Sequence, residues 1–77
     1  MSKGTASEPT SRLFHLVREE DISGVSGTGV VAEGIEFTNG MCAVGWLGST
    51  PSVNIYQNMK CVNAVHGHGG ATRVVWK

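Results

Sequence analysis

Four side chains of the kinds that bind zinc lie in the second half of the chain. They are two cysteines, Cys42 and Cys61, and two histidines, His66 and His68. A zinc site needs such ligands to converge tetrahedrally. The order Cys-x18-Cys-x4-His-x-His matches no standard zinc-finger spacing. We therefore assign no metal ligand and expect Cys42 in the core and both histidines exposed beside a glycine turn.

The same histidines are the natural candidates for a general base. A general base must lie within hydrogen-bond reach of a nucleophile or a substrate proton, and no Gly-x-Ser-x-Gly or Cys–His signature accompanies them. The glycine-rich stretch 24–34 lacks the lysine of a phosphate-binding loop. The sequence predicts no catalytic residue and favours a binding protein over an enzyme.

Size and charge limit what the chain can bind. It has 77 residues, 16% of them charged, with six basic and six acidic side chains and a net charge of zero. This is enough for one small domain, and weak charge leaves little repulsion against self-association. A protein that binds nucleic acid through its phosphates carries an excess of basic residues. Because this chain has no such excess, we expect a protein partner or a second copy instead.

The localisation follows from the start of the chain and its longest apolar runs. Residues 1–11 are polar and small rather than a secretory signal, and no stretch reaches membrane-spanning length. We expect a cytoplasmic protein with both thiols free and no membrane contact.

The chain divides into a tail and one domain. Residues 1–12 are rich in Ser, Thr, Gly and charged residues, a composition typical of a disordered tail. Residues 13–77 form the domain. Its first strand is predicted at Leu13–Val17, followed by a long loop over residues 18–27.

The strongest structural signal is the hairpin at Asn39-Gly40, flanked by apolar runs. A two-residue turn there places Phe37 opposite Cys42 and Ile35 opposite Val44. Side chains alternate between faces, so one face, expected to be the core, carries Phe37, Ile35, Cys42, Val44 and Trp46. Glu33 also falls on that face, and a bulge at Gly34 would rotate it outward.

The opposite face of this hairpin carries small residues. They are Ala32, Gly34, Ala43 and Gly45. A nearly bare sheet surface lets another backbone come close, so this face is a predicted self-association surface. The alternative is that the glycines only allow the sheet to bend.

The remaining elements are short. Residues 52–56 alternate as a strand, and the apolar spacing of Met59, Val62 and Val65 predicts a short helix that Gly67 caps in the left-handed conformation. Thr72–Trp76 is the last strand. Tyr56, with polar neighbours, is the best exposed aromatic, and the predicted binding residues are Ser52, Val53, Asn54, Ile55 and Tyr56.

The order of elements resembles the SH3-like barrel. The predicted fold is therefore all-β, a small SH3-like barrel of about five strands with one short helical turn before the last strand. The segment Ser52-Val53-Asn54-Ile55-Tyr56 also resembles the pore strand of type II, plasmid-borne dihydrofolate reductases. That resemblance implies an alternative function: a homotetramer that reduces dihydrofolate with NADPH, with residues 53–56 lining one pore. Glu19-Glu20 stand where that family has a lysine pair.

A second resemblance covers more of the chain. Residues 14–37, His66-Gly-His-Gly-Gly70 and Val74-Val-Trp76 look like small uncharacterised proteins of phage and prophage genomes. This implies a microbial or viral origin and no particular activity. Only the resemblance to the reductases implies a cofactor, NADPH. The rest of the sequence implies none.

Overall fold

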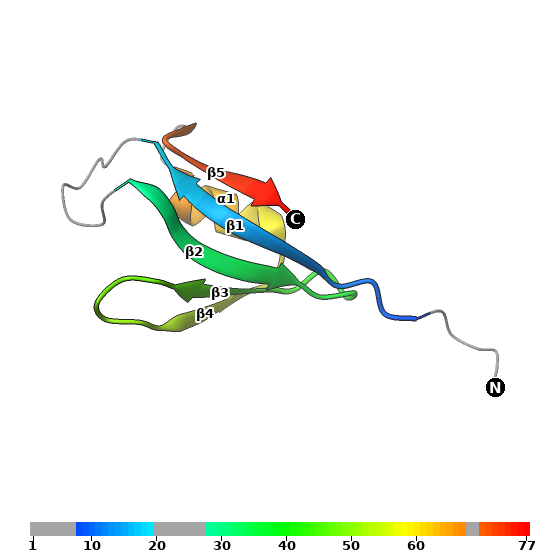
Figure 1. Ribbon diagram of the computed structural model, residues 1–77. Coiled ribbons are helices and arrows are strands. Elements are labelled where there is room, and N and C mark those ends of the chain that lie inside the picture. The colour runs from blue at the N-terminus through cyan, green and yellow to red at the C-terminus, as the bar shows by residue number, and fades with distance from the viewer. Residues whose placement is uncertain (1–7, 20–27, 68–69) are drawn as a thin grey trace.

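The computed structural model describes residues 8–19, 28–67 and 70–77 (Figure 1). Those ranges contain five strands and one helix. The bounds are β1 Arg12–Arg18, β2 Gly29–Glu36, β3 Cys42–Trp46, β4 Val53–Tyr56, α1 Met59–His66 and β5 Thr72–Trp76. The prediction of an all-β fold with five strands and one short helix before the last strand is confirmed.

All five strands belong to one antiparallel sheet, in the order β4-β3-β2-β1-β5. β4 and β5 are its two edges, and no ladder joins them among the described strands. The predicted closure into an SH3-like barrel therefore remains a prediction.

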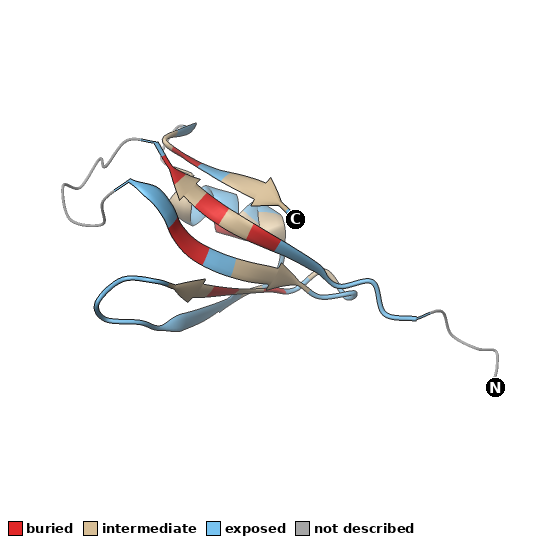
Figure 2. Cartoon of the chain, in the orientation of Figure 1, coloured by how far each residue is buried: buried red, intermediate tan, exposed pale blue. Residues whose placement is uncertain are grey.

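The sheet has an inner face, covered by α1, and an outer face on the opposite side (Figure 1). Val62 of α1 is 1% exposed and belongs to the core on the inner face, with Met59 packed beside it. Buried residues lie on β1, β2 and β3 (Figure 2). The core consists of Phe14, Leu16, Val31, Ala32, Cys42, Val44 and Val62.

The hairpin between β2 and β3 is present, but its predicted register is wrong by one residue. Ile35 pairs with Ala43, not with Val44. The turn has three residues between the Phe37–Met41 pair rather than two, and Gly40 adopts φ +91°. A one-residue shift moves a strand's side chains to the other face. Ile35 thus lies on the outer face, and Phe37 is exposed.

The predicted bulge also lies elsewhere. Leu16 pairs with Ala32, but Val17 pairs with Val30, which leaves Val31 as the extra residue of β2. Gly34 pairs regularly with both Phe14 and Val44. Once the register is corrected, Glu33 needs no bulge, because it already lies on the outer face.

The predicted helix exists, with two corrections. Asn58 caps its start, and its side-chain oxygen accepts a hydrogen bond from Cys61 N–H at 2.9 Å. Val65 is exposed rather than packed on the core. Gly67 has φ −66°, a right-handed conformation, so the predicted left-handed cap is wrong there; the positive φ occurs at Gly70.

β5 closes the domain against β1. The rings of Phe14 and Trp76 meet edge to face with centroids 5.4 Å apart. The guanidinium of Arg12 lies 4.0 Å from the centre of the Trp76 ring, a cation–π arrangement. These contacts join the first and last strands into one unit.

Candidate binding surface

The outer face is formed by two rows of side chains that cross the sheet. Strand pairing places Leu13, Ile35, Ala43 and Ile55 in one row. The second row contains Val75, His15, Glu33, Gly45 and Val53. Since α1 packs on the inner face, much of this apolar surface meets solvent: Leu13 is 52% exposed, Ile55 62% and Val53 67%.

Ala43 and Gly45 lie in the middle of these rows and leave a hollow of about 400 Å³, the outer hollow. Leu13, Ile35 and Val53 border it, and the charged side chains of Glu33 and Lys77 also line it. A Cβ on Gly45 would find its nearest neighbour, Glu33 O, at an ordinary 3.7 Å. The outer hollow is thus open rather than tightly filled.

The four small residues predicted to share one face do not share it. Ala43 and Gly45 are on the outer face, whereas Ala32 is completely buried and Gly34 lies under the Phe14 ring on the inner face. The register shift explains the split, because it changes which β2 residues accompany each β3 residue.

The predicted binding segment 52–56 is also divided between surfaces. Val53 and Ile55 belong to the outer face, and Asn54 and Tyr56 point to the inner side. Residues 53–56 therefore do not all face one pore, as the reductase resemblance implied. Alternation along a strand imposes this division.

Asn54 and Tyr56 belong to a cluster of polar and aromatic side chains that contact one another within the chain. Trp46 Nε1 donates a hydrogen bond to Asn54 Oδ1 at 2.7 Å, and Tyr56 Oη lies 2.5 Å from His66 Nε2. The Trp46 and His66 rings meet edge to face, with centroids 4.7 Å apart. Burial raises the pKa of the Tyr56 hydroxyl. The cluster anchors the end of α1 to the sheet, which is a structural role.

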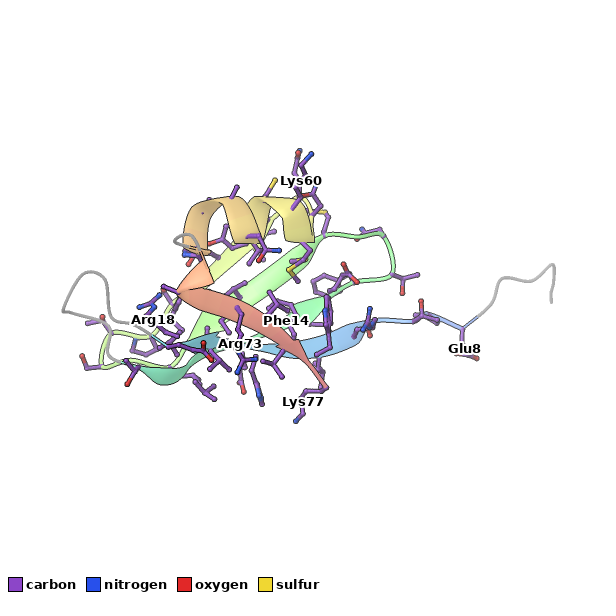
Figure 3. The ribbon with its side chains drawn as sticks, turned by 90° about the horizontal axis from the view of Figure 1, so that it is seen from above. Glu8, Phe14, Arg18, Lys60, Arg73 and Lys77 are labelled. Atoms are coloured by element: carbon purple, nitrogen blue, oxygen red, sulfur yellow. The ribbon has the colours of Figure 1, made fainter. Side chains whose placement is uncertain are left out.

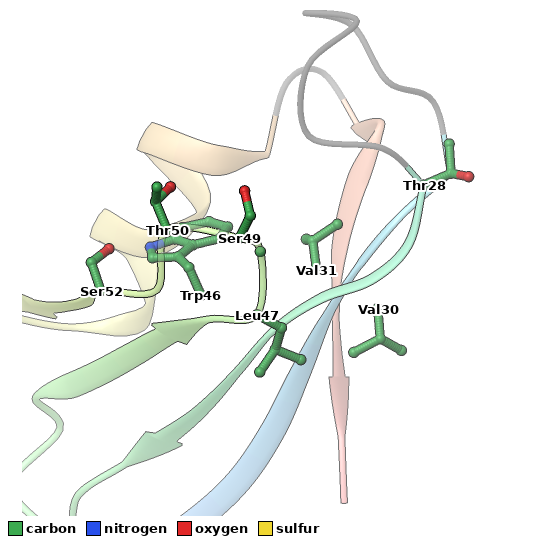
Figure 4. Close-up of a pocket in the computed structure, with 9 residues that line it drawn as sticks. Thr28, Val30, Val31, Trp46, Leu47, Ser49, Thr50 and Ser52 are labelled. Carbon is green, nitrogen blue, oxygen red and sulfur yellow. The ribbon is translucent and has the colours of Figure 1, made fainter.

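A second hollow, the end pocket, lies where the chain connects β3 to β4 (Figure 4). Its volume is about 370 Å³. Hydroxyl side chains from residue 28 and from 49–52 lie beside Trp46 and the apolar residues Val30, Val31 and Leu47. Ser52, the first predicted binding residue, belongs here rather than to the outer face.

The two cysteines are separate thiols. Cys42 is buried and Cys61 half-buried. Burial, then the charge of Glu36, then Cys61 raise the pKa of the Cys42 thiol. Within the described ranges no three His, Cys, Asp or Glu side chains are placed to hold a metal ion. The predicted exposed residue His68 lies outside the described residues.

Arg73 of β5 and Lys77, the residue directly after β5, lie on the outer side. Figure 3 shows Lys60 on the helix, and Arg73 and Lys77 on the side of the sheet away from it. Arg73 Nε is 3.0 Å from Glu19 Oε1, an exposed ion pair. Within residues 8–19, 28–67 and 70–77, no helix has the length and apolar character needed to cross a membrane.

Sequence reasoning missed Leu13 and Ile35 as surface residues. Both β1 faces carry apolar side chains, so alternation in Leu13-Phe14-His15-Leu16 could not tell which face is buried. The predicted two-residue turn places Ile35 in the core, whereas the actual turn has three residues. The available signal was the three-residue turn Thr38-Asn39-Gly40, a standard hairpin connection with a left-handed third residue.

The fold and its surface define a small, mostly β protein with one helix and an apolar outer sheet face. The chain matches the family model described as Acb5 phage protein over residues 11–77, and it belongs to that family. The predicted resemblance to a phage protein family is thereby confirmed. No curated protein and no solved structure matches the chain.

Proposed function

We propose that this phage protein is a small, non-enzymatic binding protein that associates with itself through the outer face. The observation that carries the proposal is the apolar surface around the outer hollow. Five strands about 4.8 Å apart and about 20 Å long give a face of roughly 400 Å². The largest apolar patch on a protein is commonly of this size and is often functional.

The energetic gain comes from the half-exposed aliphatic side chains. Complete burial of a Leu, Ile or Val side chain contributes about 1.5–3 kcal/mol. Leu13, Val53 and Ile55 still expose half or more of their surface, so each would contribute about 1 kcal/mol per copy when covered. Summed over two copies, this is comparable with the several kcal/mol that association costs.

The charges on the outer face are compatible with the pairing of two copies. The outer face carries Glu33 together with His15, and Lys77 lines the outer hollow beside them. A two-fold axis through the hollow can place Glu33 of one copy near a basic side chain of the other. The net charge of zero adds little long-range repulsion.

The test is sedimentation velocity on the wild type and two variants. We expect Ala43→Arg, which places a charge in the outer hollow, to weaken the outer-face contact at least tenfold. The control Asn63→Arg adds the same charge on the exposed surface of α1 and should leave the assembly unchanged. A wild type that is monomeric at 100 µM would contradict the proposal.

The reductase alternative gains no support from the geometry. Asn54 and Tyr56, the polar pair of the resembling strand, already make hydrogen bonds within the chain. Titration with NADPH, followed by Trp and Tyr fluorescence, tests it directly. On the binding proposal, no saturable change in fluorescence is expected.

A further inference from the structure

β4 is an edge strand whose outward backbone groups can be identified. Trp46 N–H donates to Ser52 O. In an antiparallel ladder, hydrogen-bonded pairs alternate with non-hydrogen-bonded pairs. Asn54 and Tyr56, which pair with Val44 and Cys42, therefore direct their backbone groups toward β3. The N–H and C=O groups of Val53 and Ile55 point away from β3.

The hydrogen bonds between β3 and β2 lead to the same assignment. Phe37 N–H donates to Met41 O, and Leu47 N–H donates to Val31 O. Odd-numbered residues of β3 thus bond to β2, and even-numbered residues bond to β4. None of the backbone hydrogen bonds outside the ladders involves Val53 or Ile55 within the described ranges. Two donors and two acceptors are therefore free along this edge.

The two edges of the sheet differ in how they are protected. Natural edge strands commonly carry charged residues or proline against unwanted pairing. β5 carries Arg73, with Lys77 directly after it, so two β5 strands side by side would bring like charges together. Residues 52–57 are all uncharged, and Val53, Asn54 and Ile55 are exposed. β4 is the edge without a charged residue.

We propose that β4 pairs with β4 of a second copy, antiparallel about a two-fold axis at Asn54. In this register Val53 of each copy faces Ile55 of the other, and the pair exchange both backbone hydrogen bonds. All four free groups are then satisfied. The side chains of Val53 and Ile55 from both copies lie together on one continuous outer face.

The occupant is a second copy because the edge complements itself. The free groups of Val53 and Ile55 are related by the axis, and paired residues point to the same face. The edge contact leaves Ala43 and Gly45 uncovered, so it is separate from the outer-face contact proposed above. If both contacts form, edge pairing doubles the oligomer that the outer face makes.

The test compares Ile55→Pro with Ile55→Ala by sedimentation velocity. Proline is tolerated in an edge strand where its nitrogen faces solvent, so Ile55→Pro removes an edge donor while the ladder to β3 remains. Alanine shortens the same side chain but keeps that N–H group. Both variants shorten the Ile55 side chain on the outer face, so only the difference between them reports the edge N–H group. We expect Ile55→Pro to have half the mass of Ile55→Ala at the same protein concentration.

Hydrogen exchange on the wild type gives an independent readout if the proline variant does not fold. Hydrogen-bonded and non-hydrogen-bonded pairs also alternate between β1 and β5. The amides of Val74 and Trp76 therefore point away from β1, toward the β5 edge of the sheet. Under edge pairing, the amides of Val53 and Ile55 should exchange at least tenfold more slowly than these two. Equal exchange rates would overturn the edge contact.

The outcomes separate the two proposals. If Ile55→Pro is folded and keeps the wild-type mass, edge pairing is wrong and the outer-face contact stands. If Ala43→Arg leaves the mass unchanged while Ile55→Pro has half the mass of Ile55→Ala, the outer-face contact is wrong and edge pairing stands. A wild type that is monomeric overturns both.

Discussion

The core of this protein requires a residue without a side chain at Gly34. It sits directly opposite Phe14 on the inner face, and the aromatic ring occupies the space above its backbone. A Cβ there would overlap the Phe14 ring and approach Ala43 O to 2.8 Å. The glycine is therefore a packing requirement of the core, not part of an exposed small-residue surface.

We expect Gly34→Ala to lower the free energy of unfolding by about 1–3 kcal/mol, the usual cost of forcing extra volume into a packed site. The matched control is Gly45→Ala, another strand glycine, whose Cβ would meet nothing closer than 3.7 Å. It should change stability by about 0.5 kcal/mol or less. Urea denaturation at low protein concentration measures both. Equal effects of the two variants would contradict this account of Phe14 packing.

At the scale of elements, α1 depends on its ends because it is short. It spans Met59–His66 and buries one residue fully, Val62. Isolated helices of this length are marginal in water. The helix is held by the Asn58 cap at its start and by the Tyr56–His66 hydrogen bond at its end. The Tyr56–His66 contact connects α1 to the end of β4, the strand that forms the sheet edge.

Replacing Asn58 by Ala should destabilise the protein by about 1 kcal/mol, because the Cys61 N–H loses its side-chain acceptor. Asn58→Asp keeps an acceptor at that position and should retain most of the stability. The control Asn63→Ala changes an exposed helix residue. Thermal unfolding followed by circular dichroism distinguishes the three, and a loss in Asn63→Ala as large as in Asn58→Ala would count against the cap.

At the scale of the whole molecule, one sheet and one short helix form a single-sided core. A 77-residue chain buries a modest fraction of its surface on folding. The inner face is covered by α1, whereas the two rows of the outer face contain half-buried and exposed side chains and no fully buried one. Self-association would cover the second side and add stability that the isolated chain lacks.

This view makes stability depend on protein concentration. Association stabilises the folded form by mass action, so a hundredfold rise in concentration should raise the Tm of the wild type by several degrees. Differential scanning calorimetry across that range measures the shift. Ala43→Arg should show a smaller shift, and a wild-type Tm that does not change would indicate a folded monomer.

The sequence by itself determined the number and order of the elements. Asn39-Gly40 marked the hairpin, the spacing of Met59 and Val62 marked the helix, and the apolar runs marked the strands. These are local signals, carried by turn chemistry and periodicity.

Only the tertiary structure decided which face each side chain occupies. The Asn39-Gly40 signal allowed both a two-residue and a three-residue turn, and that single residue moved Ile35 outward and Ala32 inward. Because both faces of β1 are apolar, only the packing of α1 shows which face is the core. Local propensity does not contain that choice, since it depends on contacts between residues far apart in the chain.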